Sequence, residues 1–295
     1  MPSFKRLAMN LAMGIVAGLL VAVILVRLLE HHFIYFPPRY PDGFIPPENY
    51  GLALEEAWMT TTDGIRLNAW FLLAPSSPRV ILWFHGNAEN IGYGLAQLKA
   101  FSRLGANVLA VDYRGFGKSQ GSPDEAGIYQ DAETAYRYLV ESKHFEPRNV
   151  FVYGHSLGGA VAIDLAARRE CGGLIAESTF TTGREMARRM FRIPFFEYVP
   201  RTRFDSLGKI AKVRAPILII HGTGDAVVPF EMGKRLAQAA PQPKSLLAIE
   251  GAGHDDVYLI GGEAYAQRLR DFIGGLRAES ARAPSRPKEK EHEVR

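Results

Sequence analysis

Short runs of apolar, β-branched and aromatic residues recur along the middle of the chain, separated by longer segments with helical spacing. The short runs predict strands at residues 55–60, 67–73, 80–84, 108–111, 150–153, 174–176, 217–220 and 245–249. The longer segments predict helices at residues 91–103, 124–143, 159–169, 230–240 and 257–276. A turn at Thr62-Asp63-Gly64 joins the first two strands, and the other strands alternate with helices. The pattern therefore predicts an α/β fold, with a mostly parallel eight-stranded sheet covered by helices on both faces.

The N-terminal region has a different pattern, because residues 7–29 are apolar except for Asn10 and Arg27. A membrane helix needs about 20 such residues, so we expect residues 1–32 to form a single-pass N-terminal membrane anchor. A cleaved signal peptide would need small residues after the apolar run, where this chain has leucine, valine and arginine. A buried core helix would rarely be so uniformly apolar. Two basic residues flank each side of the run, so the positive-inside rule gives no orientation.

The rest of the chain divides by composition. Residues 33–51 are aromatic and proline-rich and are expected to form a stalk. The predicted α/β domain covers residues 52–276, with a short insert after the sixth strand at residues 178–213. Because the predicted sheet begins near Glu55, we expect nothing before it to belong to the core of the domain. Residues 277–295 are mostly charged, Ala, Ser and Pro, which predicts a disordered tail.

Composition and charge exclude several classes of function. The 295 residues are 47% hydrophobic and 22% charged, an ordinary globular balance. The formal net charge is +4, but basic residues are scattered without interleaved aromatic residues, so no nucleic-acid partner is expected. The single cysteine, Cys171, excludes an internal disulfide and a cysteine-based metal site.

One glycine-rich motif follows the fifth predicted strand and precedes a strong helix former. It reads Gly154-His155-Ser156-Leu157-Gly158 and matches G-x-S-x-G. This spacing places a serine on a sharp strand-to-helix turn with its hydroxyl exposed, because only glycine fits the tight backbone on either side. The motif predicts Ser156 as a nucleophile.

A serine hydroxyl needs a base, and the base needs an orienting acid. Asp225 follows the seventh predicted strand and His254 follows the eighth, in the order that this type of site requires. Glu177 also follows a strand and is a rival acid, although its position in the order fits less well. We expect His221 to brace its loop and the His155 side chain to point away from the hydroxyl.

The negative charge that develops on the substrate oxygen needs two backbone N–H donors. One is the residue after the nucleophile, Leu157, and the other lies in the loop after the third strand, where Asn87 is the predicted donor and Ala88 is the alternative. No phosphate-binding loop and no histidine or carboxylate set with metal-ligand spacing is found, so no cofactor and no metal are expected.

From about Leu52 to Leu276 the sequence resembles the α/β-hydrolase superfamily. The resemblance rests on five motifs that occur in order: His85-Gly86-Asn87-Ala88, Asp112-Tyr113-Arg114-Gly115, Gly154-His155-Ser156-Leu157-Gly158-Gly159, His221-Gly222-Thr223-Gly224-Asp225 and Gly253-His254-Asp255. The chain looks most like the membrane-anchored branch that includes serine-aminopeptidase-like hydrolases and eukaryotic protein depalmitoylases. The resemblance implies acyl hydrolysis through an acyl-enzyme, without a cofactor. A hydrophobic segment stands where the depalmitoylases carry an N-terminal cysteine cluster.

The insert bears on the substrate. Its apolar side chains either pack on the domain, line an acyl pocket or contact the membrane, and they are Met186, Met190, Phe191, Ile193, Phe195, Phe196, Tyr198 and Phe204. Its arginines form a basic fringe suited to anionic lipid headgroups, and they are Arg184, Arg188, Arg189, Arg192, Arg201 and Arg203. We expect a serine hydrolase that cleaves esters or thioesters of small-molecule or lipid-like acyl substrates. The alternatives are an aminopeptidase-like amide hydrolase and a non-catalytic membrane-bound interaction protein.

Overall fold

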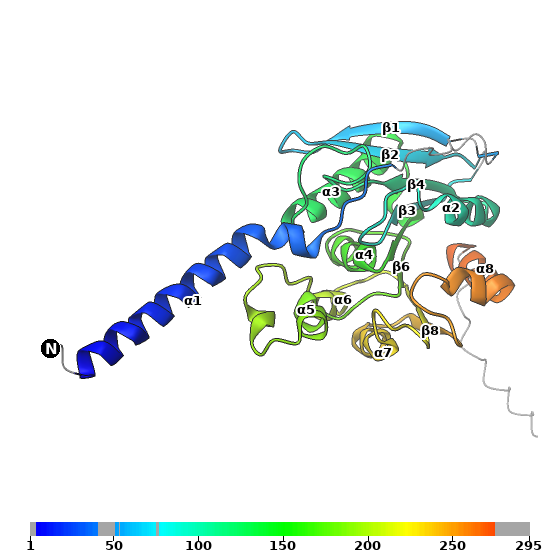
Figure 1. Cartoon of the computed structure of the whole chain (residues 1–295). Coiled ribbons are helices and arrows are strands. Elements are labelled where there is room, and N and C mark those ends of the chain that lie inside the picture. The colour runs from blue at the N-terminus through cyan, green and yellow to red at the C-terminus, as the bar shows by residue number, and fades with distance from the viewer. Residues whose placement is uncertain (1–3, 41–50, 53, 75–76, 275–295) are drawn as a thin grey trace, which may run out of the picture.

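The computed structural model describes residues 4–40, 51–52, 54–74 and 77–274. Its centre is an eight-stranded sheet with the strand order β1-β2-β4-β3-β5-β6-β7-β8 (Figure 1). β1 and β2 pair antiparallel, as do β2 and β4, and every other neighbouring pair is parallel. The strands are β1 (Leu54–Thr60), β2 (Arg66–Leu72), β3 (Val80–Phe84), β4 (Asn107–Val111), β5 (Val150–His155), β6 (Gly173–Glu177), β7 (Ile217–Gly222) and β8 (Lys244–Ile249). The predicted fold class is confirmed.

Two layers of helices cover the sheet, because the central strands are apolar on both faces. In β3, Leu82 and Phe84 belong to one buried cluster while Ile81 and Trp83 belong to the other. The first cluster is closed by α3 (Glu125–Arg137), α4 (Leu157–Arg168) and α7 (Phe230–Ala239). The second is closed by α2 (Leu95–Phe101) and α8 (Val257–Gly274). The strand alternation therefore sends successive side chains into opposite cores.

The insert contains two helices that the sequence pattern did not predict. They are α5 (Gly183–Phe191) and α6 (Ser206–Ile210), joined by a chain that includes a short 3-10 turn at Phe196–Tyr198. Thr182 caps α5 by accepting a hydrogen bond from the N–H of Glu185. α5 buries none of its residues, because it lies on the outside of the domain.

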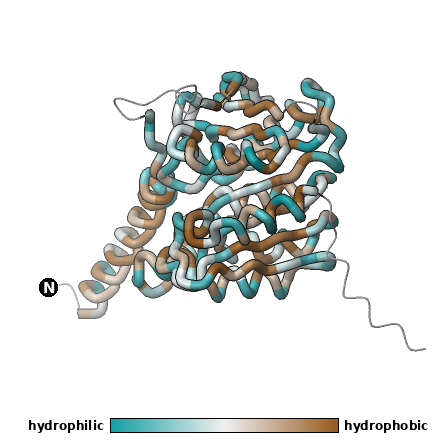
Figure 2. Tube along the Cα trace, turned by 90° about the vertical axis from the view of Figure 1, so that its right-hand side faces the viewer, coloured by the Kyte–Doolittle hydropathy of each residue, from teal (hydrophilic) through white to brown (hydrophobic). Residues whose placement is uncertain are grey.

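The apolar N-terminal run forms one long helix, α1 (Phe4–Ile34), which projects from the domain on the side of α5 (Figure 1). Its 31 residues span about 46 Å, and hydrophobic positions follow one another along it (Figure 2). It is long and apolar enough to cross a membrane. α1 continues into the segment expected to be a stalk, residues 33–51, of which residues 41–50 lie outside the described residues.

The expectation that nothing before Glu55 belongs to the core is wrong. The Tyr35 side chain is only 2% exposed and joins the same cluster as α3 and α4, where its ring meets the Phe204 ring edge-on. Leu52 is buried in the second cluster. The tail expected at residues 277–295 lies outside the described residues.

Candidate active site

Ser156 stands on the turn between β5 and α4 with a backbone conformation of φ 52° and ψ −114°. Two glycines permit this turn. A Cβ atom on Gly154 would lie 1.9 Å from the carbonyl oxygen of Gly158, and one on Gly158 would lie 2.1 Å from the carbonyl oxygen of Phe84. These close approaches press the start of α4 against the end of β3. Ser156 is thereby presented beside the loop that follows β3.

The structure brings Ser156, Asp225 and His254 together. The ring nitrogen Nδ1 of His254 lies 2.8 Å from Asp225 Oδ2, and Nε2 lies 3.0 Å from Ser156 Oγ. Asp225 comes from the loop after β7 and His254 from the loop after β8, so neighbouring parallel strands deliver both groups to one edge of the sheet. The imidazole therefore connects a carboxylate to a hydroxyl, with one ring nitrogen for each.

Asp225 is held as a carboxylate by several donors. Its Oδ1 accepts the backbone N–H groups of Val227 and Val228, at 2.9 and 2.8 Å. Its Oδ2 faces His254 and also lies 3.3 Å from Nε2 of His221. Burial opposes ionisation, but hydrogen bonds from His221 and His254 outweigh it and hold the pKa of Asp225 well below its usual range. An ionised Asp225 keeps the His254 proton on Nδ1 and leaves Nε2 free to accept the serine proton.

The rival acid, Glu177, is engaged elsewhere. Its Oε2 accepts hydrogen bonds from the hydroxyls of Tyr153 and Tyr265, at 2.6 and 2.7 Å. Glu177 is buried at the end of β6, and the carboxylate that contacts His254 is that of Asp225. The ring nitrogen Nε2 of His155 lies 3.0 Å from the backbone carbonyl oxygen of His254. It therefore braces the loop that carries His254, a contact for which the sequence held no signal.

The two predicted N–H donors lie at the same site. Leu157 is the first residue of α4, where the helix supplies no acceptor for its N–H. Asn87 lies in the loop after β3 and lines the same cavity as Ser156 and Leu157. The side chain of Asn87 makes two hydrogen bonds that the sequence did not indicate. Their partners are the backbone groups of Ile34, at the end of α1, and of Phe36, just after it.

Ser156 opens into a cavity of about 190 Å³ whose lining is largely apolar. The insert contributes Met186, Met190 and Phe191 to this lining. Other apolar side chains of the insert behave differently, since Phe204 is also buried in the core while Phe195 is 77% exposed. The sequence analysis missed that α1 contributes as well, through Phe33 and Ile34. The remaining residues that line the cavity are Asn87, Leu157, Phe180, Gly183, Ala187, Glu197, Pro200, Thr202, Val227 and Val228.

In the part of the chain that the structure describes, one group of side chains has metal-ligand spacing. His155, His254 and Asp255 offer ligand atoms within 4.8 Å of one another. Both ring nitrogens of His254 already face Asp225 and Ser156, so a metal ion there would have to displace the serine or the aspartate. The arrangement is suited to proton transfer rather than to metal binding.

The sheet order, the serine on its glycine turn and the loops after β7 and β8 together define an α/β-hydrolase. Comparisons with known proteins agree. The family described as "Serine aminopeptidase, S33" matches residues 75–206, and the family described as "TAP-like protein" matches residues 197–280.

The chain is 36% identical over 229 residues to human alpha/beta hydrolase domain-containing protein 17B, covering 74% of this chain and 75% of that protein. It is 36% identical over 234 residues to protein 17C of Mus musculus, covering 75% and 68%. It therefore belongs to the α/β-hydrolase superfamily, and within it to the family of alpha/beta hydrolase domain-containing proteins 17. Among solved structures, an esterase of Pyrococcus furiosus shares the fold with a TM-score of 0.68 at 22% identity, over 81% of this chain and 98% of that one. An esterase domain from Rhodothermus marinus has a TM-score of 0.59 at 21% identity, over 76% and 100%.

Proposed function

We propose that this hydrolase is a serine hydrolase that cleaves ester or thioester bonds of substrates with an apolar acyl chain. The observation that carries the proposal is the placement of the His254 ring, 2.8 Å from Asp225 and 3.0 Å from Ser156. A histidine that contacts both a hydroxyl and a buried carboxylate is arranged to activate the hydroxyl as a nucleophile.

In the proposed mechanism, Ser156 Oγ attacks the carbonyl carbon of the substrate while Nε2 of His254 takes the hydroxyl proton. Asp225 stabilises the imidazolium that forms. The N–H groups of Leu157 and Asn87 hold the oxyanion. His254 then gives its proton to the leaving alcohol or thiol, and an acyl-Ser156 ester remains. Water, deprotonated by His254, attacks this ester. The acyl group leaves as an acid, and His254 returns the proton to Ser156 Oγ.

The lining of the cavity favours an acyl substrate over a peptide amine. Apolar side chains from the insert and α1 surround the approach to Ser156. An aminopeptidase needs a free carboxylate to bind the ammonium group of its substrate. Among the described residues that line the cavity, the one carboxylate is Glu197, which is paired with Arg188.

We further propose that α1 anchors the protein in a membrane. Its large apolar side chains are exposed along the helix, which is costly in water and favourable in lipid. A signal sequence near the N-terminus passes the same criteria of length and composition, so membrane fractionation has to test the anchor separately. Ile193 and Phe195 of the insert are exposed as well. They follow α5, which lies on the side from which α1 projects (Figure 1).

The test of the proposed chemistry is labelling with a fluorophosphonate probe and hydrolysis of p-nitrophenyl acyl esters. Ser156→Ala should abolish both with an unchanged circular dichroism spectrum. Ser102→Ala, at an exposed serine in the 3-10 turn that follows α2, is the matched control and should keep both. Labelling that persists in Ser156→Ala would contradict the assignment of the nucleophile.

A further inference from the structure

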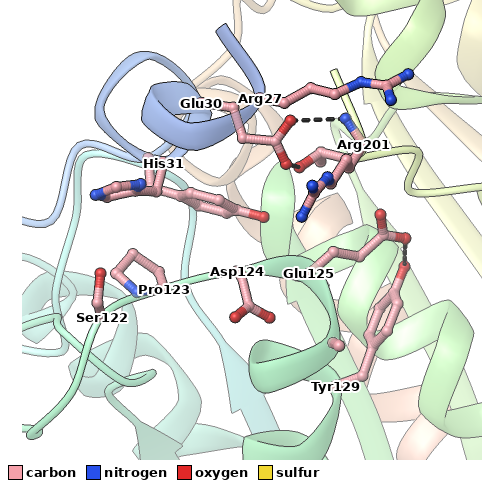
Figure 3. A pocket seen from close by; sticks show the side chains of 12 residues that line it. Arg27, Glu30, His31, Ser122, Pro123, Asp124, Glu125, Tyr129 and Arg201 are labelled. Carbon is pink, nitrogen blue, oxygen red and sulfur yellow. Dashed lines mark hydrogen bonds between the residues drawn. The ribbon is translucent and has the colours of Figure 1, made fainter. Parts of the chain in front are cut away.

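The C-terminal end of α1 is fastened to the insert. Nε of Arg27 donates a hydrogen bond to the backbone carbonyl of Val199, at 2.9 Å. The carboxylate of Glu30 accepts two more, from the backbone N–H of Arg201 at 2.6 Å and from Thr202 Oγ1 at 3.1 Å. Figure 3 shows the Glu30 side chain pointing from α1 toward Arg201. α1 is therefore attached to the domain by polar contacts, one of which satisfies a backbone N–H of the insert.

A second attachment reaches the active site itself. Nδ2 of Asn87 donates a hydrogen bond to the carbonyl of Ile34 at 2.6 Å, and Oδ1 of Asn87 accepts the N–H of Phe36 at 3.1 Å. Between these two bonds, Tyr35 is buried in the core. The amide side chain thus holds the chain that leaves α1 beside the loop whose backbone N–H is the proposed oxyanion donor.

The attachment places α1 in the wall of the cavity. Phe33 and Ile34 line the cavity that contains Ser156, together with Met186 and Met190 of the insert. Phe33 is 52% exposed, so part of its side chain lies outside the cavity. The volume of about 190 Å³ is smaller than the roughly 300–1,000 Å³ of pockets that enclose a drug-sized ligand. A long acyl chain would fill the cavity with its first carbons and extend outward past the last turn of α1.

We propose that Phe33 and Ile34 are specificity-determining residues that form part of the acyl-binding site, so that the anchor helix and the hydrolase domain share one substrate site. The proposal rests on the proposed function and narrows it to acyl chains that already lie in a lipid phase. N-terminal to Phe33, the part of α1 that projects from the domain carries exposed apolar side chains (Figure 2). A chain that leaves the cavity along this surface stays in lipid while its carbonyl group reaches Ser156.

The experiment measures kcat/KM of the full-length protein in detergent micelles for p-nitrophenyl acetate, butyrate and octanoate. Phe33→Ala and Ile34→Ala are compared with Leu29→Ala. Leu29 precedes Phe33 by one turn on the same face of α1 but does not line the cavity. The ratio of octanoate to acetate should fall by about fivefold in Phe33→Ala and in Ile34→Ala, because a longer chain loses more apolar contact. Leu29→Ala should keep the wild-type ratio.

The outcomes separate the two proposals. If the wild type is active and all three variants keep its ratio, the acyl-site assignment is overturned while the serine hydrolase stands. If Leu29→Ala lowers the ratio as much as Phe33→Ala, the effect comes from the apolar helix in general, which also overturns it. A wild type that neither hydrolyses any ester nor labels at Ser156 overturns both. Thermal unfolding of each variant shows whether the altered ratio belongs to folded protein.

Discussion

Replacing Asp225 with asparagine tests the proposed mechanism most directly, because the structure determines how the amide must sit. Oδ1 of Asp225 accepts two backbone N–H groups, those of Val227 and Val228. An asparagine at this position must keep its carbonyl oxygen there, since its NH₂ group would face two donors. The NH₂ group is then directed at Nδ1 of His254, 2.8 Å away in the native site.

An NH₂ group in this place donates to Nδ1 and moves the ring proton of His254 to Nε2. The nitrogen that faces Ser156 Oγ at 3.0 Å then carries a hydrogen and can no longer accept the serine proton. Loss of a triad acid in this way costs on the order of 10⁴ in kcat in a serine protease, or about 5 kcal/mol of transition-state stabilisation. Because the amide cannot flip to restore the tautomer, we expect the full loss in Asp225→Asn.

The assay is kcat for p-nitrophenyl butyrate, with Glu177→Gln as the control. Glu177 contacts Tyr153 and Tyr265 and not His254, so its variant should change kcat by less than about tenfold even if it lowers stability. The reasoning is refuted if Asp225→Asn loses less than about tenfold, or if Glu177→Gln loses as much as Asp225→Asn.

Three further results are expected. The depressed pKa of Asp225 contributes stability that is present above the unfolded-state pKa of about 3.9 and is lost as the pH falls below it. The difference in unfolding free energy between wild type and Asp225→Asn should therefore shrink between pH 6 and pH 3 in urea titrations, and a constant difference would contradict this. Gly158→Ala should lower the free energy of unfolding by roughly 3 kcal/mol, because its Cβ would meet the Phe84 carbonyl, whereas Gly274→Ala, with open space around it, should not. Full-length protein should stay with membranes through high-salt and alkaline carbonate washes, and its recovery in the soluble fraction would remove the anchor hypothesis.

The sequence pattern was sufficient for the strands, the order of the motifs and the elbow at Ser156. These are local properties. Successive side chains of a strand point to opposite faces of the sheet, so a strand that is apolar throughout needs a sheet covered on both faces. A serine between glycines after a strand fits one kind of turn. The boundaries of β3 agree with the predicted ones, and those of the other strands differ from the predicted ones by one or two residues at one or both ends. The helices of the insert were missed because α5 buries none of its residues fully and α6 is only five residues long, so neither leaves a clear helical period in the sequence.

The sequence by itself determined the fold class and nominated Ser156, Asp225 and His254 through residue types placed after successive strands. The order of the motifs favoured Asp225 over Glu177, but only the tertiary structure shows which carboxylate reaches His254, because both residues follow strands. It also decided the place of Phe33, Ile34 and Tyr35. Their apolar character suits a membrane, a stalk or a core equally well. The hydrogen bonds that bring them to the active site come from Asn87, more than fifty residues away in the sequence. Contacts between residues so far apart produce no periodic pattern of hydrophobic and polar positions, so the sequence alone does not reveal them.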